Sequence, residues 1–167
     1  MPTKVPSKRR PLASSLAKLP SAAAICTVLA IAGSASADAA TYYWDADATA
    51  AGNDISTGAG LGGAGIWNST WSITPTASWY DPTAIPPGNV IWPNVFGDGD
   101  TAVFSGTGGA VSLDGTIMVN NLRFTSDGYS ITNGGNTLNF LTLSGTTPTI
   151  DVVTSGHNAT STSRIDG

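Results

Sequence analysis

The sequence predicts an all-β protein organised as a β-solenoid, in which short strands stack on one another in successive turns of the chain. Three observations lead to this prediction. Only 11% of the 167 residues are charged, and 20 are glycine. The second half of the chain alternates short apolar runs with tight Gly, Asn and Asp turns. A β-sandwich is the alternative, because Asp-Gly and Asn-Gly turns also suit antiparallel hairpins.

Residues 1–37 have the features of a signal peptide. Five of the seven Lys and Arg residues lie in the first 18 positions, and an apolar run follows at residues 22–32. This run is shorter than the roughly 20 residues of a permanent membrane helix. Ala35-Ser36-Ala37 matches the small-residue pattern that signal peptidase accepts. We therefore expect residues 1–37 to contact the export machinery, and the rest to act outside the cell or on the outer-membrane surface.

Residues 38–99 form a region rich in Gly, Pro and Trp. Its five prolines disfavour helices, so we expect irregular loops that join short strands. The region also contains every tryptophan of the chain, and we expect these rings to cover one end of the fold as an N-terminal cap. The tryptophans are Trp44, Trp67, Trp71, Trp79 and Trp92.

Residues 100–167 are expected to form the rungs of the solenoid. Phe104 and Phe124 are 20 positions apart, and Leu122 and Phe140 are 18 apart, which suggests a repeat of roughly 20 residues. Scarce charge favours stacking, because ladders of identical polar side chains are tolerated where ladders of like charge repel. The expected strands are residues 101–104, 110–113, 117–119, 121–124, 129–132, 138–143 and 149–153.

The same alternation predicts which side chains face the interior. They are Val103, Phe104, Val111, Leu113, Ile117, Val119, Leu122, Phe124, Ile131, Leu138, Phe140 and Leu143. The last residues, 164–167, contain no feature that would cover a final rung. We therefore expect an incomplete solenoid at the C-terminus, with self-association through that end as one consequence.

The composition beyond the signal peptide argues against catalysis and against nucleic-acid binding. This part has no Cys and no Glu, and His157 is its single histidine. Neither a zinc site nor a Ser-His pair with a recognisable nucleophile motif can be assembled from it. This part contains two arginines and eleven aspartates, so no basic surface for nucleic acid is expected. We predict a non-enzymatic protein without a cofactor.

Asp98-Gly99-Asp100 is the acidic segment best suited to bind a ligand or to take part in a reaction. In an extended segment, Asp98 and Asp100 would present two carboxylates on one face, which suits a calcium ion or carboxylate-based glycoside hydrolysis. Asp is also a common turn residue, and we favour that interpretation. Calcium at Asp98 and Asp100 is the alternative.

Carbohydrate binding is the alternative function. Exposed indole rings bind sugars by stacking, so Trp67, Trp71, Trp79 and Trp92 would be the glycan contacts of a secreted carbohydrate-binding module. Large aromatic residues in a small chain without cysteines more often supply buried area. We favour burial of these rings. Surface glycans are the partners that the alternative function would imply.

Several short aromatic and glycine motifs recur along the chain: Tyr43-Trp44-Asp45, Ile66-Trp67-Asn68, Ser78-Trp79, Trp92-Pro93 and the segment 99–106. Their spacing resembles the N-terminal part of bacterial surface proteins that carry autotransporter-associated β-strand repeats. The resemblance spans roughly residues 41–156. It implies a right-handed parallel β-helix, and a passenger with an adhesin-like scaffold role on or near a Gram-negative cell. The glycine-rich repeat unit that usually follows is missing, so we expect a fragment of a longer protein.

Overall fold

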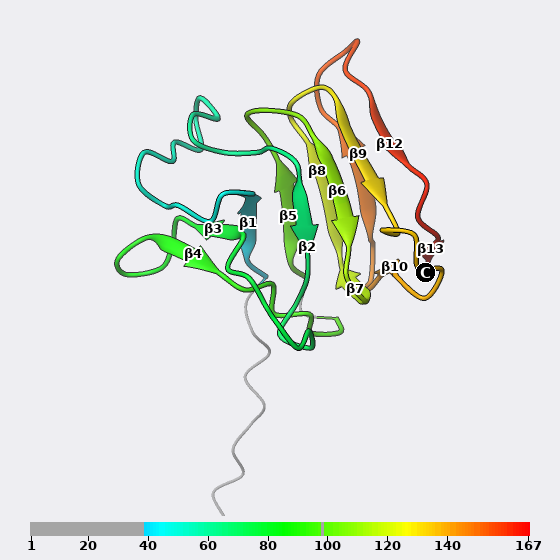
Figure 1. Ribbon diagram of the computed structural model, residues 1–167. Helices are drawn as coiled ribbons and strands as arrows, with labels where there is room; N and C mark the ends of the chain where they lie inside the picture. The colour runs from blue at the N-terminus through cyan, green and yellow to red at the C-terminus, as the bar shows by residue number, and fades with distance from the viewer. Residues whose placement is uncertain (1–38, 98) are drawn as a thin grey trace, which may run out of the picture. The chain divides into compact units, whose positions relative to one another are not determined.

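The computed structural model describes residues 39–97 and 99–167, and all regular structure in them is β-strand (Figure 1). Thirteen strands form three sheets that contain parallel pairs. The all-β prediction is therefore confirmed. Within the described residues, no helix is long and apolar enough to cross a membrane. The signal peptide predicted for residues 1–37 lies outside the described residues.

The first sheet has six strands in the order β11-β8-β5-β1-β3-β4. The first four of these pair in parallel, whereas β3 and β4 add antiparallel strands beyond β1. The strands are β1 (Thr41–Trp44), β3 (Trp79–Asp81), β4 (Gly88–Val90), β5 (Thr101–Phe104), β8 (Asn121–Phe124) and β11 (Thr149–Val152).

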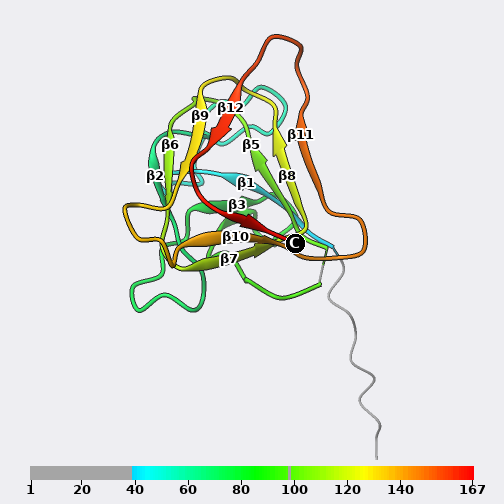
Figure 2. The ribbon, with the colours of Figure 1, turned by 90° about the vertical axis from the view of Figure 1, so that its right-hand side faces the viewer.

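The other two sheets consist of parallel strands, in the orders β12-β9-β6-β2 and β13-β10-β7. Viewed end-on, the strands of the three sheets lie around a common interior (Figure 2). The strands of the second sheet are β2 (Gly65–Trp67), β6 (Ala110–Leu113), β9 (Tyr129–Thr132) and β12 (Ala159–Ser161). Those of the third are β7 (Thr116–Val119), β10 (Phe140–Leu143) and β13 (Ile165–Asp166).

From β5 onward the chain visits the three sheets in a fixed order. We call each passage a circuit: β5-β6-β7, β8-β9-β10 and β11-β12-β13. Phe104 pairs with Phe124 on the next circuit, and their rings stack with centroids 4.9 Å apart, so 20 residues separate these two positions. The interval is not constant along the chain, because Leu122 pairs with Ile150, 28 residues later. Leu122 and Phe140 lie in different sheets, so the 18-residue interval is not a repeat. The Asp114-Gly115 turn joins strands of different sheets instead of forming a hairpin.

The core follows the predicted interior with two corrections around β10. Leu138 is 74% exposed and Phe140 is half-buried, whereas Leu141 is fully buried. The strand begins at Phe140, two residues later than predicted, and Leu138 belongs to the preceding turn. The alternation therefore places Leu141, which pairs with Ile117, on the inner face. Val103 is also buried, but it lies on the outer face of β5, where alternation with the inward-facing Ala102 and Phe104 places it, so its predicted inward orientation is wrong. The buried apolar residues that match the prediction are Phe104, Val111, Leu113, Ile117, Val119, Leu122, Phe124 and Ile131.

Four tryptophans of the N-terminal region join this core. Trp79 lies among the other three, with ring centroids 4.8–5.2 Å from theirs. It also contacts Phe104, so the cluster continues directly into the first circuit. Each of the four side chains is fully buried, and together we call them the tryptophan cluster: Trp44, Trp67, Trp79 and Trp92.

The edge of the third sheet is covered by a side chain. Asn94, which is 1% exposed and has φ of 59°, follows Trp92 beside β7. Its Nδ2 donates to the Thr116 carbonyl at 3.0 Å, and its Oδ1 accepts from the Met118 N–H at 2.6 Å. The Asn94 amide therefore satisfies one carbonyl and one N–H of β7, as the backbone of a neighbouring strand would.

Candidate functional site on the outer face of the first sheet

A polar groove of about 560 Å³ lies on the outer face of β1, β5 and β8. The loop residues 55–58 and the corners at residues 105–106 and 125–126 also line it. The floor combines hydroxyl, phenol and guanidinium groups. The floor residues are Thr41, Tyr43, Thr101, Val103 and Arg123.

Strand alternation explains why these side chains point outward. Ala102 and Phe104 are fully buried in β5, so Thr101 and Val103 lie on the opposite face. The parallel register then aligns equivalent positions of successive strands. The result is an outer column of residues that belong to four strands: Tyr43, Val103, Arg123 and Asp151.

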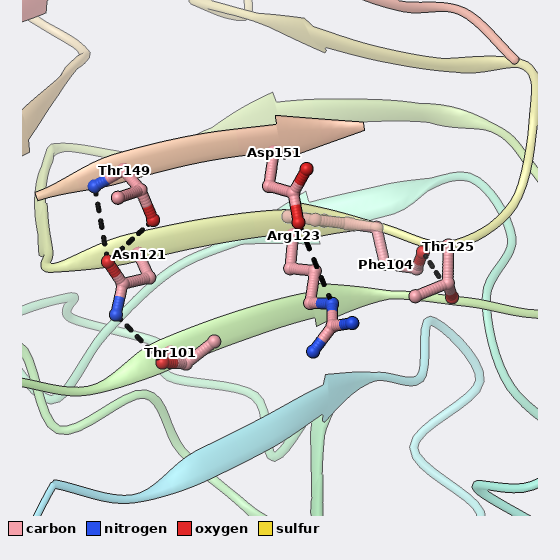
Figure 3. A network of polar contacts seen from close by, with 7 residues as sticks. All are labelled: Thr101, Phe104, Asn121, Arg123, Thr125, Thr149 and Asp151. Carbon is pink, nitrogen blue, oxygen red and sulfur yellow. Dashed lines mark hydrogen bonds and ion pairs between the residues drawn. The ribbon is translucent and has the colours of Figure 1, made fainter. Parts of the chain in front are cut away.

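A second outer column consists of hydrogen-bonded polar side chains (Figure 3). Asn121 Nδ2 donates to Thr101 Oγ1 at 3.2 Å, and Asn121 Oδ1 accepts from Thr149 Oγ1 at 2.8 Å. The Thr149 N–H also donates to Asn121 Oδ1, at 3.1 Å. One asparagine therefore links three strands, which fixes the side chains beside the groove floor.

Arg123 supplies the positive charge of the groove. Its Nε lies 4.0 Å from Asp151 Oδ2, and both side chains are more than half exposed, so the ion pair is weak (Figure 3). The guanidinium therefore keeps N–H groups for a ligand. The groove is suited to hydroxyl-rich or anionic molecules, and its geometry contains no nucleophile–base pair.

The loop that overhangs the groove is stabilised by its own carboxylate. Asp54 Oδ1 accepts from the Ser56 N–H at 2.8 Å and from Ser56 Oγ at 2.6 Å. These hydrogen bonds lower the pKa of Asp54 to about 2, so it is ionised at neutral pH. At Gly58 a side chain would collide with the backbone of Gly106, so glycine allows the loop to approach this corner closely.

The acidic pair predicted from the sequence is only partly described. Asp98 lies outside the described residues. Asp100 is 4% exposed, and its Oδ1 accepts from the Ala40 N–H at 2.9 Å. Its carbonyl also accepts from Asn120 and Asn121. Asp100 therefore ties the start of β1 to the first circuits, and calcium at Asp98 and Asp100 stays a prediction.

The tryptophans predicted as glycan contacts are not a surface platform. Trp67, Trp79 and Trp92 are fully buried, and Trp71 is 61% exposed. Stacking on a sugar requires an accessible ring face, so the carbohydrate-binding alternative based on these residues finds no support. In the described part of the chain, no three His, Cys, Asp or Glu side chains group as metal ligands.

The groove was missed because its residues carry no motif. Tyr43 and Arg123 are 80 positions apart in the sequence, and they meet on one face through the pairing of β1, β5 and β8. One signal was available: Arg123 alternates with Leu122 and Phe124, which places it on the outer side of its strand.

A comparison with curated proteins finds a similarity to the "Adhesin BmaC autotransporter" of Brucella suis biovar 1 (strain 1330). The identity is 37% over 128 residues, which cover 73% of this chain. They cover 3% of the length of that adhesin. The predicted resemblance to autotransporter-associated surface proteins is thereby confirmed. No family model and no solved structure matches the chain.

Proposed function

We propose that this chain is a structural section of an exported, adhesin-like surface passenger. In this proposal residues 39–99 form the N-terminal cap, and residues 100–167 form the first turns of a right-handed parallel β-solenoid. The observation that carries it is the register of the circuits. β5 pairs with β8 and β8 with β11 in parallel, and the other two sheets repeat the same stacking.

The mechanism we propose is mechanical. Each circuit contributes apolar side chains to the interior and hydrogen-bonded side chains to the surface. Phe104 stacks on Phe124 inside, while Ser112 and Thr132 hydrogen-bond at 3.2 Å outside. Such contacts join only neighbouring circuits, so a stack can be lengthened without changing its cross-section. A scaffold of this kind holds binding surfaces away from the cell without catalysing a reaction.

The location of the passenger is the second part of the proposal. Similarity to an autotransporter adhesin and the export signal predicted at residues 1–37 support transport to the cell surface. The test is an epitope tag inserted in the exposed turn at residues 133–136, in the gene of the source bacterium. We expect antibody to label intact cells, and deletion of residues 39–167 to reduce their attachment to surfaces. A tag reached only after the outer membrane is permeabilised would contradict surface exposure.

Self-association through the last circuit is a further part of this proposal. β11, β12 and β13 each end a sheet among the described residues. Two apolar side chains near these edges are exposed: Ile150 on β11 is 49% exposed, and Val153, which follows β11, is 43% exposed. Unpaired parallel edges with apolar neighbours accept additional strands. We expect Ile150→Lys to lower the fraction of oligomer in sedimentation experiments, whereas Ile73→Lys, at a 98% exposed loop position, leaves it unchanged.

A further inference from the structure

A buried polar cluster lies in the N-terminal region, apart from the groove. Asp45 follows β1, Asn53 lies in the loop after it, and Asn89 belongs to β4. Asp45 is fully buried, and its Oδ2 accepts from Asn53 Nδ2 and from Asn89 Nδ2, both at 2.7 Å. The Asp45 carboxylate therefore points at two amides that reach it from separate segments.

The cluster contains more acceptors than donors. Asp45 Oδ1, Asn53 Oδ1 and Asn89 Oδ1 are all buried, and none has a hydrogen-bond partner. An unpaired buried oxygen is costly, and an unpaired carboxylate oxygen is the costliest of them. Such oxygens are satisfied either by water molecules that donate hydrogen bonds or by a metal cation, and the presence of a carboxylate favours the cation.

Asp47 brings a second carboxylate to this place. It is exposed and lines a hollow of about 460 Å³. Burial raises the pKa of Asp45, and the neighbouring Asp47 carboxylate adds to this effect. Two adjacent carboxylates are stabilised when a cation lies between them.

The sequence spacing agrees with this arrangement. Asp45, Asp47, Thr49 and Asn53 occupy positions 1, 3, 5 and 9 of a loop, which are ligand positions in calcium-binding loops. Gly60 makes room for the amide, because a side chain there would collide with Asn53 Oδ1. The loop therefore carries the donor atoms in a suitable order without being an EF-hand.

We propose that Asp45, Asp47, Asn53 and Asn89 bind a calcium ion. The donors are carboxylate and amide oxygens, which calcium prefers, and the cluster offers no nitrogen or sulfur ligand for zinc. Rotation of the two terminal amides by half a turn exchanges Nδ2 for Oδ1 and directs both oxygens toward Asp45. The ion would join β1, its following loop and β4, and so stabilise the N-terminal end of the stacked strands.

The test uses the full chain and terbium luminescence, because Tb³⁺ replaces Ca²⁺ and is sensitised by nearby tryptophan such as Trp44. We expect sensitised emission that CaCl₂ displaces, with a Kd on the order of 10⁻⁴–10⁻³ M for a site outside the cell. Asp47→Asn should abolish it. Asp114→Asn is the matched control, since it removes the same charge at an exposed turn position outside the cluster, and it should leave emission unchanged.

A second variant tests whether calcium raises or lowers the melting temperature. Asn53→Asp adds a carboxylate, so without calcium it should lower the melting temperature, and with 10 mM CaCl₂ it should raise it above that of the wild-type chain. The wild-type chain should gain about 4 °C from the same calcium. No calcium-dependent shift in either protein, or equal loss of emission in Asp47→Asn and Asp114→Asn, would overturn the proposal. Neither outcome bears on the proposed surface role.

Discussion

The two ends of the stacked strands differ in how their interior and their last strands are covered. At the N-terminal end, Trp79 and its three neighbours fill the interior, and the β3–β4 pair adds two antiparallel strands to the first sheet. At the other end, a shallow apolar groove of about 80 Å³ opens between β11, β12 and β13. Ile150 and Ile165 on this groove are 49% and 38% exposed. We call these the closed end and the open end (Figure 1).

The difference shows what stacking by itself does not provide. A strand within the stack receives hydrogen bonds and apolar contacts from both neighbours, and a terminal strand receives them from one. At the closed end, non-repeating features replace the contacts that a further strand would make. Indole rings fill the interior, and the Asn94 amide forms hydrogen bonds with the β7 edge. Stability should therefore be concentrated at the closed end, and the following substitutions test that expectation.

The largest effect is expected from Trp79→Ala. Trp79 is fully buried among Trp44, Trp67, Trp92 and Phe104, so its removal leaves a large cavity. We expect the free energy of unfolding to fall by about 3–5 kcal/mol in urea titrations.

Trp71→Ala is the matched control for Trp79→Ala, because Trp71 is 61% exposed. It should change the free energy of unfolding by less than about 0.5 kcal/mol. Comparable losses in the two variants would show that the tryptophan cluster is not the main support of the closed end.

Asn94→Ala should have the next largest effect. It removes two hydrogen bonds at once and leaves the Thr116 carbonyl and the Met118 N–H without partners at a buried edge. The expected loss is about 2–3 kcal/mol, with faster hydrogen exchange at Met118. Asn136→Ala removes a side-chain hydrogen bond in an exposed turn and should cost less than about 1 kcal/mol. Unchanged exchange at Met118 would mean that Asn94 does not protect β7.

The middle of the fold was largely predictable from sequence, because its signals are local. Alternation in residues 110–113 and 121–124 gave the correct inner faces. The same reasoning failed at β10, where apolar Leu138 lies in a turn and shifts the pattern by one residue. The strands β12 and β13 are short and polar, and no alternation marks them.

The closed end was predictable in kind but not in detail. Tryptophan content indicated a cap, yet which rings are buried depends on contacts between distant segments. Trp79 is buried by β1, whereas Trp71, eight residues earlier, is exposed. The Asp45–Asn89 hydrogen bond likewise joins residues 44 positions apart. Pairings of this kind follow from the packing of the whole chain and leave no periodic pattern in the sequence.

Tyr129 extends the comparison to pH, because its ring packs on Phe104 and Phe124 below the tryptophan cluster. Its hydroxyl donates to the Ser105 carbonyl at 2.6 Å, and burial raises its pKa above the ordinary value of about 10. Tyr129→Phe should lower the free energy of unfolding by about 1 kcal/mol at neutral pH.

The pH dependence of this difference follows from the raised pKa. Above pH ~10 the unfolded chain loses the Tyr129 proton while the folded chain keeps it, so the wild-type protein loses stability there. The Phe variant has no such proton, and the difference between the two proteins should shrink between pH 10 and 11. Urea titrations at pH 8, 10 and 11 measure it. A constant difference would show that the phenol is accessible to solvent.

The smallest effect is expected at the open end, from Arg164→Ala. The Arg164 guanidinium lies 3.8 Å from the centroid of the Phe140 ring and 2.9 Å from Asp166 Oδ2, with more than half of its side chain exposed. Exposed contacts of both kinds are worth about 0.5–1 kcal/mol. Arg164→Lys keeps the charge but loses the planar contact with the ring, so it should recover part of the loss. If Arg164→Ala instead cost as much as Trp79→Ala, the last circuit would be as firmly held as the first, and the contrast between the two ends would fail.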